Sequence, residues 1–198
     1  MSTFIAGFSL GLSLIFAIGS QNAFVLKQGL KNEYVFIICV LCALSDAILI
    51  GVGVGGFGAI VNKFPEVEMF ARYGGAIFLS IYSLLSFKSA FTIDHALHSN
   101  VDSKASMAKV IVMSLAFTWL NPHVYLDTVI LLGSISTQYQ PNQLMFAIGA
   151  MTASFVFFFS LGYGSRCLAP VFKKPISWKI LEFVVGIVMG TMAISLLY

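Results

Sequence analysis

Charged residues are scarce in this chain. Of its 198 residues, 10% are Asp, Glu, Lys or Arg, whereas 59% are hydrophobic, and the mean hydropathy is +0.94. A chain of this size with so little polar surface cannot cover a water-soluble core. The net charge of +3 is small and does not favour nucleic acid as a partner. The composition therefore predicts an integral membrane protein.

The chain also lacks the patterns typical of enzymes and metalloproteins. Its three cysteines lie within or beside apolar runs, without a second Cys or His pair at ligand spacing. No nucleotide loop, zinc signature or Ser/His/Asp spacing is present. A polar segment offers four residues for a metal cluster, but they are also ordinary in a solvated loop: Asp94, His95, His98 and Asp102. We therefore expect no enzyme, no cofactor and no bound metal.

Six long apolar stretches fill the chain almost from end to end. Each has about 20 residues or more, enough for a helix to cross a hydrocarbon core of roughly 30 Å. None alternates strictly in the manner of an outer-membrane strand, and the first has no basic leader or cleavage site, so we expect it to be retained. The predicted fold class is an all-α integral membrane protein, a single domain over 1–198 with six transmembrane helices. The expected spans are 4–26, 36–61, 70–91, 110–135, 143–165 and 178–198.

Lysine and arginine are distributed unevenly between the expected loops. One side has only Lys63 and Arg72. The other side has nine positive residues: Lys27, Lys31, Lys88, Lys104, Lys109, Arg166, Lys173, Lys174 and Lys179. Because positive loops stay in the cytoplasm, this bias predicts a cytoplasmic loop at about 92–109 and both termini outside.

The two halves of the chain share weak motifs in the same order. Ser13-Leu14-x-Phe16 recurs as Ser114-Leu115-x-Phe117, and Gly51-x-Gly53 recurs as Gly162-x-Gly164. Three spans in each half would place the copies in opposite orientations. We therefore predict two inverted three-helix repeats, at about 1–91 and 110–198, an architecture that many secondary transporters use.

Two carboxylates lie near the middle of apolar runs, Asp46 in CALSDAILIGVGVGG and Asp127 in NPHVYLDTVILLG. A charged group there costs on the order of 2.5–3.5 kcal/mol, so it needs a partner, a proton or a water-filled cavity. The alternative is that each aspartate is a hydrogen-bonded helix clamp. Ser45 is then the nearest partner of Asp46, and Tyr125 or Thr128 that of Asp127.

The first and fourth apolar runs contain helix-breaking segments at matching places. Gly19-Ser20-Gln21-Asn22 puts a flexible residue and three hydrogen-bonding side chains in the first run, and Asn121-Pro122-His123 puts a proline in the fourth. Freed backbone groups at membrane depth are tolerated where they line a cavity or meet protein. We therefore expect helix breaks and a shared central cavity, although a glycine notch and a proline kink between packed helices would also fit.

Three segments, GSQNAFVLKQGL at 19–30, LSDAILIGVG at 44–53 and FTWLNPHVYLDTVILLG at 117–133, resemble the signatures of the lysine/arginine exporter (LysE) family, and the whole chain resembles its arginine exporter branch. The resemblance implies a bacterial inner-membrane carrier that expels basic amino acids, driven by the electrochemical gradient. It also implies a pathway surrounded by six residues: Gln21, Asn22, Asp46, Asn121, Pro122 and Asp127. Ser20 stands where the family usually has proline, which predicts a less sharp break or a kink at Gly19 alone.

The chemistry of these residues agrees with a cationic amino acid as substrate. A deprotonated aspartate matches the guanidinium of arginine bidentately, and Gln21, Asn22, Asn121 and a half-helix N-terminus offer donors for a carboxylate. Two aspartates in one cavity cannot readily both stay ionised, so one of them is expected to carry a proton.

Several alternatives stay open from the sequence. His123 is either a proton relay or a structural histidine that bonds a neighbouring helix. A carrier of neutral amino acids or of divalent cations would have the same architecture. The glycine pairs of Gly7-x-x-x-Gly11 and Gly186-x-x-x-Gly190 could pack within the chain or join two copies in a homo-oligomer.

Overall fold

The computed structural model describes residues 2–16, 19–57, 65–92, 106–168, 170–195 and 197, and these ranges contain only helices and short connections. The longer helices are α1 (Ser2–Ile15), α2 (Ser20–Lys31), α3 (Val35–Val52), α5 (Pro65–Thr92), α6 (Met107–Trp119), α9 (Gln143–Gly164) and α10 (Pro175–Ser195). The shorter elements are η1 (Gly53–Phe57), α7 (Pro122–Tyr125), η2 (Leu126–Leu131), α8 (Leu132–Ser136), η3 (Thr137–Tyr139), η4 (Ser165–Leu168) and η5 (Val171–Lys173). The prediction of an all-α protein is confirmed.

Three of the described helical segments are long and apolar enough to cross a membrane: Val35–Gly56, Gln143–Leu168 and Pro175–Ser195. The bent pair formed by α1 and α2 brings the number to four if the pair is one span. Shorter apolar helices cover Ala76–Phe91 and Met107–Trp119. The structure thus supports a multi-pass helical membrane protein, while the number of six spans stays a prediction.

The first and fourth expected spans are not continuous helices. The axes of α1 and α2 differ by 81°, and α2 begins after Gly19, whose backbone is extended (φ −102°, ψ 174°). The fourth expected span is divided into α6, α7, η2 and α8. It breaks at Asn121, which is also extended (φ −101°, ψ 105°) and precedes Pro122. A residue before proline is biased to this conformation, so the local sequence accounts for the second break.

The prediction that Lys27 and Lys31 lie in a loop is wrong. Both belong to α2, which ends at Lys31 and turns into α3 through Asn32 and Tyr34, two residues with positive φ (56° and 51°). The helix continues beyond the apolar part of the first span because Lys27 finds a buried partner, described below. Lys88, Lys109 and Lys179 also lie in helices, and on the other side Arg72 lies in α5. The orientation with both termini outside stays a prediction. Most of the expected loop at 92–109 lies outside the described residues.

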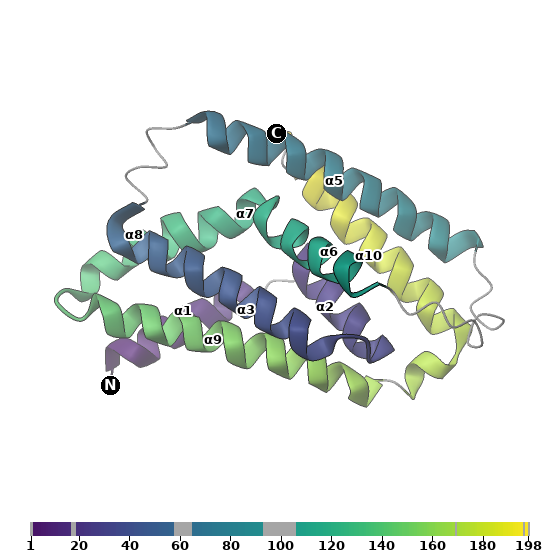
Figure 1. Cartoon of the computed structure of the whole chain (residues 1–198), viewed down its shortest axis with the longest axis horizontal. Helices are drawn as coiled ribbons and strands as arrows, with labels where there is room; N and C mark the ends of the chain where they lie inside the picture. The colour runs from purple at the N-terminus through teal and green to yellow at the C-terminus, as the bar shows by residue number, and fades with distance from the viewer. Residues whose placement is uncertain are drawn as a thin grey trace.

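The helices form two groups with α2, α6 and α7 between them. Figure 1 shows α1, α3 and α9 side by side on one side of the molecule, and α5 alongside α10 on the other. A Cβ atom on Gly7 would meet the carbonyl carbon of Phe146 at 2.8 Å, and one on Gly11 would meet the Cα of Ala150 at 3.0 Å. Glycine therefore lets the backbones of α1 and α9 approach closely.

The second glycine pair, Gly186 and Gly190, lets the backbone of α10 approach α5 closely. A Cβ atom on Gly186 would lie 2.9 Å from the ring of Phe87, and one on Gly190 would lie 3.1 Å from the hydroxyl of Ser83, so these glycines seat α10 on α5. Ser83 also donates a hydrogen bond of 2.7 Å to the carbonyl of Gly186. In this structure, both glycine pairs pack within the chain.

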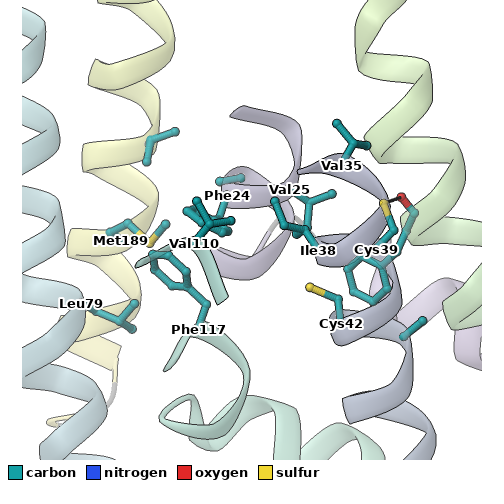
Figure 2. Close-up of a cluster of buried hydrophobic side chains, with 14 of the residues drawn as sticks. Phe24, Val25, Val35, Ile38, Cys39, Cys42, Leu79, Val110, Phe117 and Met189 are labelled. Carbon is teal, nitrogen blue, oxygen red and sulfur yellow. Dashed lines mark hydrogen bonds between the residues drawn. The ribbon is translucent and has the colours of Figure 1, made fainter. Parts of the chain in front are cut away.

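A buried hydrophobic cluster joins the two groups of helices. Phe24 of α2 and Phe117 of α6 lie at its centre, with Leu79 of α5 and Met189 of α10 around them (Figure 2). Phe117 is fully buried, and its ring centroid lies 5.1 Å from that of Phe24. This cluster fixes α2 and α6 relative to α5 and α10.

Candidate functional site

A cavity of about 280 Å³ lies where the two broken helices meet. Its polar lining consists of Gln21, Asn22, Asp46, Asn121, His123, Asp127 and Thr128. Gly19 lines it as well, and Leu14, Ile15, Ile50, Val124, Leu132, Phe158 and Met192 add apolar walls. The polar residues predicted from the sequence therefore meet in one place, on α2, α3, α7 and η2.

Two predicted residues lie next to the cavity in sequence but are not part of its lining. Ser20 and Pro122 are buried at the first positions of α2 and α7. Proline suits the first position of a helix because that N–H has no intrahelical partner. Serine occupies this place in α2, yet α1 and α2 still meet at 81°, so a sharp break persists without proline.

Asp46 is anchored to the fifth apolar run. Its side chain is 3% exposed, and its Oδ2 accepts a hydrogen bond of 3.1 Å from the hydroxyl of Ser154 on α9. Ser45 does not act as its clamp, because the hydroxyl of Ser45 instead accepts a hydrogen bond of 3.2 Å from the indole of Trp119. Among the described residues, the bonded partner of Asp46 is thus a neutral hydroxyl, which does not compensate a negative charge.

Asp127 occupies a different environment in the same cavity. It lies in η2, a π-helical segment, and is partly exposed, and its side chain makes no hydrogen bond to another described residue. Tyr125 and Thr128 do not clamp it: the hydroxyl of Tyr125 donates to the carbonyl of Trp119 at 2.8 Å, and that of Thr128 donates to the carbonyl of Val124. Among the described residues, no hydrogen bond therefore competes with a ligand at the Asp127 carboxylate.

Close backbone packing holds η2 against the end of α3. A Cβ atom on Gly53 would lie 2.7 Å from the carbonyl oxygen of Thr128, and one on Gly133 would lie 2.7 Å from the carbonyl oxygen of Gly53. The close contact is confined to Gly53 in this segment, because a Cβ atom on Gly55 or Gly56 would meet no described atom within 4 Å. This contact fixes how the segment of Asp127 faces the helix of Asp46.

The second break carries its own cap. Asn121 accepts a hydrogen bond of 3.2 Å from the backbone N–H of His123, as an N-cap residue does. The ring Nε2 of His123 lies 3.3 Å from the hydroxyl of Ser195 on α10. His123 thus bonds a neighbouring helix through a hydroxyl, and its role as a proton relay stays a prediction.

The first break leaves its helix end uncapped by a side chain. Gly19 is the N-cap of α2 and makes no side-chain hydrogen bond to the first turn of the helix, which begins at the cavity wall. The amide of Asn22 donates a hydrogen bond of 2.7 Å to the carbonyl of Ile15 and so links α2 to the end of α1. With Gln21 beside it, this helix end presents a positive partial charge, which favours a carboxylate.

Sequence reasoning missed Ser154 and a buried ion pair between Lys27 of α2 and Glu182 of α10. Ser154 carries no signal of its own, because serine is common in membrane helices. Glu182 did carry one, since it is a carboxylate inside the apolar run of the last helix.

Comparisons with known proteins agree with this architecture. Residues 12–198 match the family described as LysE type translocator. A protein of Mycobacterium bovis named "Putative amino-acid transporter Mb0498" is 41% identical over 186 residues, which cover 94% of this chain and 92% of that protein. The arginine exporter protein ArgO of Serratia proteamaculans is 39% identical over 197 residues, covering 99% of this chain and 96% of the relative. ArgO of Salmonella enteritidis is also 39% identical, over 99% of this chain and 93% of its own length. No solved structure matches the chain.

These matches, together with the helical fold and the polar cavity, define a membrane transporter and not an enzyme. The chain belongs to the LysE family of translocators.

Proposed function

We propose that this protein exports arginine, with lysine as a further substrate, across the bacterial inner membrane in exchange for protons. The observation that carries the proposal is the meeting of Asp46 and Asp127 in one cavity at two helix breaks. Relatives named as arginine exporters, similar over nearly their whole length, support the choice of substrate.

The cavity has the two kinds of group that a basic amino acid requires. Asp127 is partly exposed and not hydrogen-bonded to the described residues, so its carboxylate can accept the two parallel N–H bonds of a guanidinium. The start of α2, with Gln21 beside it, presents a positive partial charge that suits the substrate carboxylate at the other end. A cavity of about 280 Å³ is close to the lower end of the sizes usual for small-molecule sites.

Asp46 suits the proton better than the substrate. It is almost fully buried, and its bonded partner is the neutral hydroxyl of Ser154. A carboxylate in such a place is costly while ionised, and binding a proton relieves that cost. We assign Asp127 to the cation and Asp46 to the proton.

Export of a cation needs coupling. Moving one positive charge outward against an inside-negative potential costs about 2.3 kcal/mol per 100 mV, so a uniporter would import arginine at equal concentrations. Exchange of one arginine for one proton is electroneutral, and the pH gradient can then drive the substrate outward.

The helix pairing supports alternating access by two inverted repeats. α3 packs against α9, and α5 packs against α10, so the second and third helices of each expected repeat meet their counterparts. In transporters of this kind, one half rocks against the other around a fixed central site. The cavity at the two breaks lies where such a site is expected.

The test is transport of labelled arginine by the purified protein in proteoliposomes. Asp46→Asn and Asp127→Asn each keep size and hydrogen bonding but remove the charge, so we expect both to abolish efflux with folded protein in the membrane. Glu33→Gln, in the turn between α2 and α3, is the matched control and should transport normally. Normal efflux from both aspartate variants would contradict the proposed site. Unlabelled arginine, lysine, a neutral amino acid and a divalent cation are also tested in excess as competitors. If arginine does not compete, the proposed substrate is wrong.

A further inference from the structure

We propose that the ion pair of Lys27 and Glu182 is the gate that closes one end of the cavity, between α2 and α10. This inference rests on the proposed transport function, since a gate has meaning only for a substrate pathway. The closed end is the one at which α2 ends and α10 begins.

The ion pair links helices that are far apart in the sequence. The ammonium of Lys27 lies 2.5 Å from Oε1 of Glu182, and the two side chains are 15% and 4% exposed. The same ammonium lies 5.9 Å from the ring centroid of Tyr82 on α5, within reach of a cation–π interaction. A single buried charge thus joins α2 to the pair of helices α5 and α10.

A cluster of four aromatic rings lies beside the ion pair, and Tyr82, which the Lys27 ammonium approaches, is one of them. The ring of Phe117 is at its centre, with ring centroids of Phe24, Phe78 and Tyr82 at 5.1, 5.0 and 4.9 Å. These four rings come from α2, α5 and α6, and Figure 2 shows the rings of Phe24 and Phe117 between the helices.

The order along two helices is the same. On α2, Phe24 follows the cavity residues and precedes Lys27. On α10, Met189 lies between Glu182 and Met192, which lines the cavity. A substrate that leaves the cavity in this direction would therefore meet first the hydrophobic cluster and then the ion pair.

The ion pair of Lys27 and Glu182 has incomplete hydrogen bonding, which favours its separation. Oε2 of Glu182 and Oε1 of Gln28 are buried and have no hydrogen-bond partner among the described residues. Unsatisfied acceptors reduce the net stability of a buried ion pair. Because α5 and α10 pack mainly on each other, they can move away from α2 together when the pair separates.

The native Cys42 can report the state of this gate. It lies on α3, one helical turn from Asp46 towards the start of that helix, and is 1% exposed with its sulfur 3.3 Å from the hydroxyl of Ser114. Replacing the other two cysteines by Cys39→Ala and Cys167→Ser leaves Cys42 as the single thiol.

The experiment measures the rate at which a membrane-impermeant methanethiosulfonate modifies Cys42 in vesicles of each orientation, without substrate or gradient. Lys27→Met and Glu182→Gln should each raise the rate roughly tenfold or more from one face only, because removing one partner of a buried pair favours the open state. Lys31→Met, an exposed lysine one turn further along α2, is the matched control and should leave the rate unchanged.

Reversing the pair distinguishes a gate from a general loss of packing. The double variant Lys27→Glu with Glu182→Lys should label as slowly as the parent protein. Equal rates in parent, Lys27→Met and Glu182→Gln would overturn the gate, as would faster labelling from both faces. Since labelling needs no transport, such a result leaves the proposed function intact if Asp46→Asn and Asp127→Asn still abolish efflux.

Discussion

Replacing Gly53 by alanine should separate the two carboxylates of the cavity without touching either of them. The new Cβ atom would lie 2.7 Å from the carbonyl oxygen of Thr128, whereas ordinary contact begins at 3.4 Å, so the two segments must move apart by 0.7 Å (3.4 − 2.7). The carbonyl oxygen belongs to the backbone and the position of a Cβ atom is fixed by its own backbone, so no side-chain rotation can relieve the contact. Overpacking of this kind costs about 1–3 kcal/mol.

Transport should respond more strongly than stability. A misplacement of about 1 Å in a functional site can cost on the order of 100-fold in rate, so we expect arginine efflux by Gly53→Ala to fall on the order of tenfold or more. The assay is the initial rate of labelled arginine efflux per folded transporter, together with the midpoint of thermal unfolding in detergent. Gly55→Ala is the control, because a Cβ atom there meets nothing within 4 Å. Wild-type transport by Gly53→Ala, or equal damage by Gly55→Ala, would refute the reasoning.

The remaining predictions concern the proton site, the coupling and the topology. Ser154→Ala removes the hydrogen bond to Asp46 and should slow efflux about tenfold, given about 1.5–3 kcal/mol for a hydrogen bond to a charged group. Thr152→Ala is the control and should not slow efflux, because the hydroxyl of Thr152 bonds its own helix. Equal efflux rates in the two variants would contradict a role of Ser154 at the proton site. Collapsing the pH gradient in proteoliposomes should stop concentrative arginine transport, whereas clamping the voltage at zero should not; transport that persists without a pH gradient would exclude proton exchange. Cysteines near Ser2 and Tyr198 should react with an impermeant reagent from outside and one at Ser103 should not; labelling at Ser103 alone would reverse the orientation.

Much of the candidate site could be predicted from the sequence because its residues break local rules. Asp46 and Asp127 are charges in apolar runs, and Gly19 and Pro122 interrupt helices where an uninterrupted helix would be stable. Such departures can be recognised in the sequence without knowing which residues lie nearby in the fold. The prediction that these residues share a cavity is confirmed for Asp46 and Asp127, while their roles in transport stay predictions.

The features that the sequence could not reveal depend on contacts between distant segments. The partner of Asp46 is Ser154, 108 residues away, and nothing in either helix alone specifies that pair. Lys27 follows an apolar run directly, which is also where a loop lysine is expected, so its charge suggested a loop. Only the position of Glu182 on α10 explains why that lysine is buried in a helix.

The close packing of α1 on α9 has a consequence for how the protein is made. Gly7 packs against the backbone of Phe146, which is synthesised 139 residues after Gly7 (146 − 7). At about 5–20 residues per second, the ribosome needs roughly 7–28 s to reach it. During that time α1 lacks α9, the helix on which it mainly packs. The docking of α1 on α9 is therefore a late step in assembly, and slower elongation between the two segments should lengthen the period in which the nascent chain is open to proteolysis.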